Sequence, residues 1–288
     1  MKAHPGKGQG RERVIRVGHS PDPDDAFMFY GLASGRVPTP GYEVVQVLRD
    51  IESLNRLALE GGIEVTAVSI HAYAYLADRY ALLSCGASMG DGYGPIVVTR
   101  GLATLDELRR MTIAVPGRLT SATLALRLAL GDVRTETLPF DRILAAVASG
   151  EQQAGLLIHE GQLTWAQSGV HKSLDLGTWW AETTGGLPLP LGGNAIRRDL
   201  GEGTIKEVGR FLRASIEFGL RNRQESLSYA MEFGRGISRP LADRFVGMYV
   251  NDYTLDYGEK GRRAIEVFLR RGHEAGLIPH LVPIEFAG

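Results

Sequence analysis

Short apolar runs alternate with amphipathic helical patterns along most of this chain of 288 residues. This alternation is typical of βαβ units, in which helices join the strands of a mainly parallel sheet and cover its faces. We expect strands over residues 14–17, 42–48, 65–69, 96–99, 112–115, 134–138 and 156–158. We expect helices over residues 22–35, 50–60, 72–79, 105–110, 121–130 and 141–148. The pattern therefore predicts an α/β fold.

The last third of the chain contains only helical patterns. Four amphipathic helices are expected there, over residues 203–221, 224–233, 239–250 and 259–275. Two stretches that contain Gly and Pro beside apolar strand residues, 94–100 and 189–198, have the character of crossovers between two bodies. We therefore expect a large lobe made of residues 1–97 and 195–288, which carries the C-terminal helices, and a small lobe made of residues 98–194.

The charged residues almost cancel, with 32 Lys and Arg against 33 Asp and Glu. A net charge of −1 excludes the basic surface that a nucleic acid or an anionic membrane would require. No apolar run approaches the roughly 18 residues of a membrane span. The basic first dozen or so residues lack the apolar stretch of a secretory signal, so we expect a frayed tail and a cytoplasmic protein.

The single cysteine, Cys85, cannot form an internal disulfide. Its neighbours are apolar, which predicts a buried structural thiol rather than a reactive one. No group of Cys and His residues has the spacing of metal ligands, so no metal is expected.

His159 follows the apolar run 155–158 directly and is followed by Glu160. A strand that is buried on both faces places the next residue at the edge of the sheet, where α/β folds bind ligands. Histidine titrates near neutral pH, so at this position it can act as a general base. A packed structural histidine is the alternative. The adjacency of the two residues excludes a helical metal pair.

The turn after the first strand, residues 18–27, contains Ser20 and the acids Asp22, Asp24 and Asp25. Such residues cap helices, because their oxygens accept hydrogen bonds from free N–H groups and suit the positive helix end. Three acids in four positions exceed what capping requires. We therefore expect some of this turn to face a ligand cleft, with Ser20 and Asp24 among the contacts.

Two further strand-to-helix connections have ligand-binding potential. Ser69 ends the third expected strand, and Thr120 and Ser121 begin the helix 121–130. Free N–H groups and the dipole at a helix start form a ready site for a carboxylate or a phosphate. Capping without a ligand is the alternative at both positions.

Several motifs in this chain resemble the family of 1,4-dihydroxy-6-naphthoate synthases of menaquinone biosynthesis. They are S-P-x-P-x-D-x-F-M-F-Y at 20–30, D-x-E-x-L-N-R-x-A-L-E-G at 50–61, A-V-P-G-R-x-T-S-A at 114–122, F-D-R-I-L at 140–144, G-L-L-I-H-E-G-Q-L-T-W at 155–165, D-L-G-x-W-W at 175–180 and T-G-G-L-P-L-P-L-G at 184–192. The resemblance is specific, keeps the order of the motifs and covers nearly the whole chain after about residue 14.

This resemblance implies a fold like that of a type II periplasmic-binding protein, with two α/β lobes of mixed sheets, hinge strands and a cleft between the lobes. It also implies cleavage of cyclic dehypoxanthine futalosine to 1,4-dihydroxy-6-naphthoate and dihydroxyacetone, with no metal or organic cofactor. The partner is then a small-molecule carboxylate. Enzymes of this kind can form homodimers, but no segment of the sequence marks an interface.

Carried onto this sequence, the resemblance makes His159 the general base. It assigns substrate binding to two segments, Ala67, Val68 and Ser69 at a strand end and Thr120, Ser121 and Ala122 at a helix start. One of these loops is expected to anchor the substrate carboxylate while His159 removes a hydroxyl proton and starts a retro-aldol-type fragmentation.

The first turn departs from the family's usual S-P-C-P-N-D-T-F. Asp24 replaces an Asn amide, and Ala26 replaces a Thr hydroxyl. An ionised Asp24 that faced the cleft would repel an anionic group of the substrate.

Two other functions are compatible with such a fold. The chorismate dehydratase of the same pathway shares the fold and a similar Trp…T-G-L-P ending, but the I-H-E and L-P-L-P-L-G strings argue against it. A solute-binding protein is the non-enzymatic alternative. It is supported by fold alone, which does not decide function, and the absence of a secretory signal argues against it.

Overall fold

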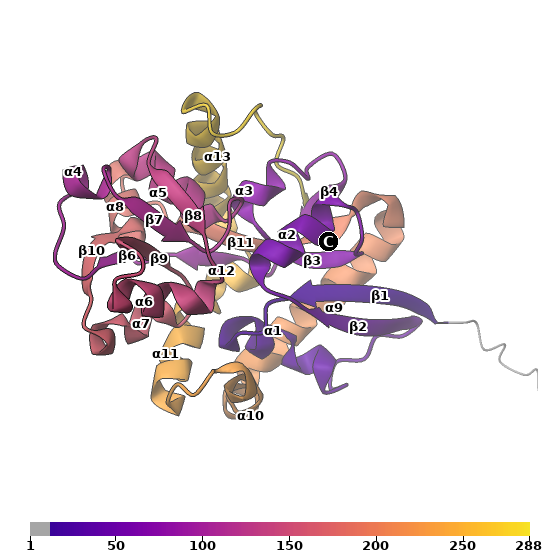
Figure 1. The fold of residues 1–288 in the computed structure, drawn as a ribbon. Helices are drawn as coiled ribbons and strands as arrows, with labels where there is room; N and C mark the ends of the chain where they lie inside the picture. The colour runs from indigo at the N-terminus through magenta and orange to yellow at the C-terminus, as the bar shows by residue number, and fades with distance from the viewer. Residues whose placement is uncertain (1–11) are drawn as a thin grey trace, which may run out of the picture.

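The computed structural model describes residues 12–288, and the expected N-terminal tail lies outside them. Two mixed β-sheets, each covered by helices, form the body of the protein (Figure 1). The larger sheet contains β1 (Arg13–His19), β2 (Tyr42–Leu48), β3 (Val65–Ser69), β4 (Tyr80–Leu83), β5 (Ser88–Gly90), β11 (Leu189–Arg197) and β12 (Phe286–Ala287). The smaller sheet contains β6 (Ile96–Thr99), β7 (Thr112–Val115), β8 (Arg134–Thr137), β9 (Ala154–Leu157) and β10 (His171–Asp175).

Both sheets combine parallel and antiparallel pairs. In the larger sheet the order is β12-β4-β11-β3-β1-β2, with β5 also paired to β11. Here β1 runs parallel to β2 and β3, whereas β11 runs antiparallel to β3 and β4. In the smaller sheet the order is β10-β6-β9-β7-β8, and β6 is antiparallel to both of its neighbours. The predicted α/β fold with mixed sheets is confirmed.

Every predicted helix except the one over residues 72–79 has a counterpart in the structure, which also contains helices that the sequence did not predict. The first part of the chain contains α1 (Pro23–Ala33), α2 (Ile51–Leu59), α3 (Ile70–Tyr73), α4 (Leu105–Leu108), α5 (Ser121–Leu130), α6 (Phe140–Ser149), α7 (Gly161–Thr164) and α8 (Leu176–Thr184). The C-terminal part contains α9 (Glu202–Arg221), α10 (Arg223–Ala230), α11 (Arg239–Tyr249), α12 (Asp252–Leu255) and α13 (Gly258–Glu274). Helices α9, α10 and α11 pack against α1, so the helical block covers the lobe that holds the start of the chain (Figure 1). None of the described helices is long and apolar enough to cross a bilayer.

The expected helix over residues 72–79 is wrong. Helix α3 ends at Tyr73, and the chain then turns into β4 at Tyr80. The backbone N–H groups of Tyr75 and Leu76 donate to carbonyls three residues earlier, which is the pattern of turns rather than of an α-helix. Because Leu76 is fully buried, tertiary packing overrides the helical periodicity here.

The chain crosses between the sheets twice. It leaves the larger sheet at Gly90 and enters β6 at Ile96, and it returns between Thr184 and Leu189. The expected lobe boundary after residue 97 falls within β6, a strand of the smaller sheet. The expected boundary after residue 194 falls within β11, a strand of the larger sheet.

The first crossover passes very close to the start of α8. A Cβ atom on Gly177 would lie 1.9 Å from the carbonyl carbon of Tyr93. Only glycine permits this approach of two backbone segments.

Candidate active site

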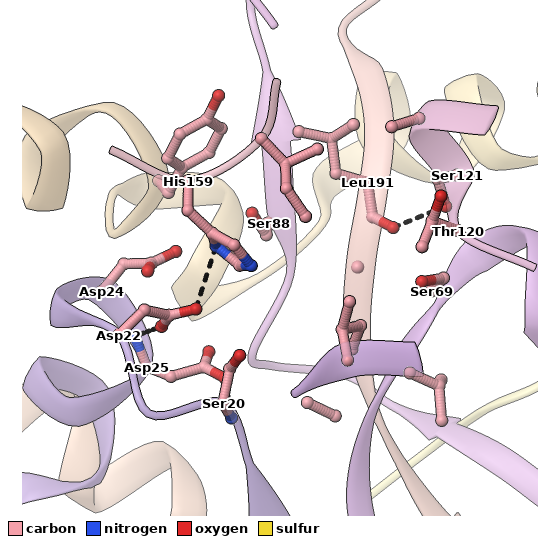
Figure 2. A pocket seen from close by; sticks show the side chains of 18 of the residues that line it. Ser20, Asp22, Asp24, Asp25, Ser69, Ser88, Thr120, Ser121, His159 and Leu191 are labelled. Atoms are coloured by element: carbon pink, nitrogen blue, oxygen red, sulfur yellow. Dashed lines mark hydrogen bonds and ion pairs between the residues drawn. The ribbon is translucent and has the colours of Figure 1, made fainter. Parts of the chain in front are cut away.

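A cavity lies between the two lobes, with walls from both sheets. All nine residues that the sequence placed in the site line it: Ser20, Asp24, Ala67, Val68, Ser69, Thr120, Ser121, Ala122 and His159. Figure 2 shows the acids of the first turn and His159 on one side of this cavity, and Ser69, Thr120 and Ser121 on the other. The cavity therefore has an acid–base end and an end formed by strand and helix termini.

The acid–base end is built on the turn between β1 and α1. Asp22 is the N-cap of α1, and its Oδ1 accepts a hydrogen bond from the backbone N–H of Asp25 at 3.3 Å. Pro23 occupies the first helical position, where no N–H is needed. Oδ2 of Asp25 accepts from the backbone N–H of Ser20 at 2.7 Å. Capping therefore accounts for Asp22, and turn closure accounts for Asp25, but neither accounts for Asp24.

His159 enters the cavity from the opposite lobe, just after β9. Its Nδ1 lies 2.9 Å from Oδ2 of Asp22 (Figure 2). Its Nε2 is buried and has no hydrogen-bond partner among the described residues. The Phe140 ring packs edge-on against the imidazole, with ring centroids 4.9 Å apart. The backbone of His159 has φ 52°, a left-handed conformation uncommon outside glycine. The packing of Phe140 and the contact with Asp22 together fix the imidazole ring of His159 in one orientation.

The charges at this end are strongly coupled. Burial alone would lower the pKa of His159, but the negative charge of Asp22 and the contact with it raise that pKa above its ordinary value. Burial opposes ionisation of Asp22 as well, yet the charge of His159 and the contact with it hold the pKa of Asp22 well below its usual range. Asp22 thus stays ionised beside His159 and makes the imidazole a stronger base than burial alone would allow.

The two neighbouring acids behave in the opposite way. Burial raises the pKa of Asp25 to about 8, and the charge of Asp22 adds to the effect. Burial, followed by the charges of Asp22 and Asp25, raises the pKa of Asp24 well above its usual range. Both side chains therefore keep their proton to a higher pH than an exposed aspartate does. An ionised Asp24 that would repel a substrate anion, as considered from the sequence, is disfavoured.

At the other end of the cavity, protein groups already satisfy most of the hydroxyls. Asn55 holds Ser69 from both sides, because its Oδ1 accepts from the backbone N–H and its Nδ2 donates to Oγ at 3.1 Å. Thr120 caps α5. The Ser121 hydroxyl donates to the carbonyl of Leu191 at 2.6 Å. What this wall offers a ligand is the start of α5, where the first N–H groups of a helix have no intrahelical acceptor.

Two contacts close the cavity across the lobes. The Tyr249 hydroxyl of α11 donates to Oε1 of Gln162 on α7 at 2.7 Å, and both side chains are buried. The Arg235 guanidinium pairs with Glu160 at 3.2 Å and donates to the carbonyl of Pro21 at 3.2 Å. These contacts lie beside His159 and tie the small lobe to the C-terminal helices.

One side-chain atom from each of Asp22, Asp24 and His159 lies within 4.8 Å of the other two. Within residues 12–288 this is the one group of His, Cys, Asp and Glu side chains close enough to share a metal ion. Because Nδ1 of His159 already contacts Asp22, a cation bound through that nitrogen would have to break this contact. We therefore describe the group as an acid–base cluster.

Sequence reasoning missed several residues of this site. The sequence explains Asp22 as a helix cap, although it belongs to the motif at 20–30, and Asn55 belongs to the motif at 50–61. Gln162 is part of the motif that contains His159. Tyr249 and Arg235 lie in the helical last third, where no motif marked them. Cys85 is buried, as expected of a structural thiol.

The fold and the cavity between its lobes define a protein of the periplasmic-binding-protein architecture. The alkanesulfonate-binding protein SsuA from Xanthomonas axonopodis, solved with MOPS, superposes with a TM-score of 0.68 at 15% identity, over 93% of this chain and 96% of that one. A crystal structure of a protein from Archaeoglobus fulgidus is more similar, with a TM-score of 0.89 and 49% identity over 93% of this chain and all of that chain.

Sequence comparison identifies the family. The family described as menaquinone biosynthesis matches residues 15–274. A 1,4-dihydroxy-6-naphthoate synthase from Thermus thermophilus is 44% identical, over 92% of this chain and 96% of that protein. One from Streptomyces coelicolor is 38% identical, over 94% and 96% respectively. The chain belongs to this menaquinone biosynthesis family, and it is an enzyme.

Proposed function

We propose that this enzyme is a 1,4-dihydroxy-6-naphthoate synthase that cleaves cyclic dehypoxanthine futalosine to 1,4-dihydroxy-6-naphthoate and dihydroxyacetone. The observation that carries the proposal is the state of His159 at the cavity wall. Its Nδ1 is held by Asp22, and its Nε2 has no partner in the described part of the chain. The names of the two relatives support the product, and the sequence motifs support the substrate.

The polarity of the cavity supports one orientation of the substrate. The N–H groups and the dipole at the start of α5 attract an anion, so this end suits the ring carboxylate. At the opposite end the described lining contains Asp22, Asp24 and Asp25, and His159 is already engaged by Asp22, so a carboxylate finds no free counter-ion there. The hydroxyl-bearing part of the substrate therefore lies against His159.

In this orientation His159 acts as the general base. Nε2 accepts the proton of a substrate hydroxyl, and the oxygen then forms a carbonyl as the adjacent C–C bond breaks. The electron pair of that bond passes to the carbonyl group of the other fragment, which becomes an enolate and later regains a proton. Asp22 stabilises the imidazolium that forms, as expected of a buried carboxylate on the far nitrogen of a catalytic histidine. This sequence of steps requires no metal and no organic cofactor.

Closure of the lobes supports the chemistry by excluding water. A water-free cavity strengthens the interactions of the acid–base cluster and protects the enolate from early protonation. The Tyr249–Gln162 and Arg235–Glu160 contacts hold the cavity in this closed form. Substrate entry then requires these contacts to open, as in other enzymes with moving lids.

The test is an assay of naphthoate formation from cyclic dehypoxanthine futalosine by the purified protein. His159→Ala is expected to lower kcat by about 10²–10⁴-fold, the usual contribution of a positioned base. His171→Ala, which changes an exposed histidine of β10, is the matched control and is expected to retain full activity. Unchanged turnover in His159→Ala would refute the role of His159.

The same assay separates the alternative functions. Chorismate is supplied in parallel, because its dehydration without naphthoate formation from the futalosine substrate would assign the protein to the dehydratase function. Tight binding of cyclic dehypoxanthine futalosine without turnover would indicate a binding protein.

A further inference from the structure

Asp24 is the acid of the first turn that has no counter-ion. It lies in the first turn of α1, is 7% exposed and lines the cavity. Its Oδ1 is buried and finds no hydrogen-bond partner within residues 12–288. By contrast, Asp22 contacts His159, and Asp25 accepts from a backbone N–H group. Burying a carboxylate in its charged form without such partners is costly, so the neutral acid is favoured.

The surroundings of Asp24 reinforce this preference. The titratable groups that face it are Asp22 and Asp25 on its own segment, His159 from the other lobe and Tyr249 on α11. Among these groups only His159 can carry a positive charge, and Asp22 engages it. Arg235, the nearby cation, is committed to Glu160 and the Pro21 carbonyl. Burial and the two flanking acids accordingly raise the pKa of Asp24 well above its usual range.

We propose that Asp24 enters the reaction as a neutral carboxylic acid, and that its O–H donates a hydrogen bond to the substrate carbonyl oxygen on which negative charge develops as the C–C bond breaks. The proposal rests on the proposed function. It makes Asp24 a catalytic residue that complements His159, with one removing a proton and the other stabilising the enolate.

The spacing of the cluster suits this division of labour. The hydroxyl oxygen and the carbonyl oxygen of an aldol are attached to carbons two positions apart, so both oxygens can approach one compact group of side chains. An atom of Asp24 and an atom of His159 lie within 4.8 Å of each other, which allows each to contact one of these oxygens. A donor that is already in place in a buried site stabilises a developing oxyanion without reorganisation.

Two substitutions at the same position separate hydrogen-bond donation from acidity. Asp24→Ala removes the donor, and we expect kcat/KM to fall by about 10²–10³-fold, as when an oxyanion donor is lost. Asp24→Asn keeps the shape and donates through its amide N–H group, and we expect kcat/KM to stay within about tenfold of the wild type. Thermal unfolding of both variants confirms that they are folded.

The protonation state of Asp24 is measured directly, on the unliganded enzyme at neutral pH. Infrared difference spectra of wild type against Asp24→Asn should contain the carbonyl stretch of a protonated carboxylic acid, which shifts on exchange into D₂O. In Asp25→Asn, the matched control, the band assigned to Asp24 should remain. This readout does not depend on turnover, so it distinguishes failure of this proposal from failure of the proposed function.

Two results would overturn the proposal. The first is the absence of a protonated-acid band that disappears in Asp24→Asn. The second is a loss of kcat/KM in Asp24→Asn as large as that in Asp24→Ala, which would show that the amide donor cannot replace the acid. Retained activity in Asp24→Asn together with the infrared band supports it.

Discussion

Nδ1 of His159 lies 2.9 Å from Oδ2 of Asp22, and the two residues belong to different lobes. Asp22 caps α1 beside the larger sheet, whereas His159 follows β9 of the smaller sheet. The contact therefore bridges the two lobes, and a separation of the lobes would break it. Under the proposed function, closing the cleft both seals the cavity and orients the base, so an open enzyme lacks a correctly positioned histidine.

This relationship leads to a prediction for Asp22→Asn. Without the carboxylate, the pKa of His159 falls, because burial then dominates, and the imidazole loses its fixed orientation. We expect kcat to fall by about 10²–10⁴-fold. The acid limb of the pH–rate profile should move to lower pH, since the base form of His159 is lost only when the pH falls through its pKa.

The measurement is kcat/KM as a function of pH for wild type and variant. Asp78→Asn, which changes an exposed acid, is the matched control and should leave the profile in place. If the acid limb of the Asp22→Asn profile stayed at the pH of the wild-type limb, the pairing of His159 with Asp22 would be contradicted.

Much of the fold follows from local patterns. The structure has β2, β3, β6, β7 and α5 at the residues expected from the sequence, because these segments combine clear periodicity with distinct turn or cap residues. Strand β10 and helix α8 are not among the elements that the sequence patterns predict. The β10 sequence is half-exposed and lacks regular alternation, so its strand conformation depends on its antiparallel pairing with β6.

The residues of the site also differ in whether sequence patterns predict them. Residues at strand ends and helix starts were found, because local topology places them at a sheet edge. The partners that orient them could not be inferred from such patterns. Asp22 and His159 are 137 positions apart in sequence (159 − 22) and meet only because the tertiary fold places the two lobes against each other. Tyr249 meets Gln162 for the same reason.

The Tyr249–Gln162 contact predicts the effect of Tyr249→Phe. The substitution leaves the buried Gln162 Oε1 without its donor, which costs about 1–3 kcal/mol of the free energy of unfolding. The closed form is weakened most, so we expect KM to rise more than kcat falls. Steady-state kinetics and urea unfolding test this, with Tyr229→Phe on α10 as the control. A variant with unchanged KM and stability would show that this hydrogen bond does not hold the lobes together.

Gly177, at the start of α8, is predicted not to tolerate a side chain, because the first crossover passes directly against it. A methyl group there would meet the backbone of Tyr93. Gly177→Ala must therefore displace either the first crossover or the start of α8, and it should destabilise the protein by about 1–3 kcal/mol. Gly203→Ala, near the start of α9, has open space around the new atom. It should stabilise the protein by about 0.5–1 kcal/mol, because alanine favours the helix. Similar melting temperatures for the two variants would argue against the close approach.

The acids of the first turn predict how stability changes with pH. The pKa of Asp25 is raised to about 8 in the folded protein, whereas an unfolded aspartate titrates near 3.9. Between these values the folded state holds a proton that the unfolded state has lost. The free energy of unfolding must therefore fall as the pH rises, by up to about 1.4 kcal/mol per pH unit for each such proton, and the decline from Asp25 ends above its folded pKa.

Urea unfolding at pH 5.5, 7 and 9 measures this decline. Asp25→Asn removes the titrating group but keeps an oxygen that can accept from the backbone N–H of Ser20, so the decline should become shallower. Part of it should persist, because Asp24 and His159 also have raised pKa values and act with the same sign. Asp78→Asn should keep the wild-type slope. If Asp25→Asn and wild type lost stability equally between pH 5.5 and 9, Asp25 would have to be ionised in the folded protein, and the negative charge beside Asp24 would be larger than inferred above.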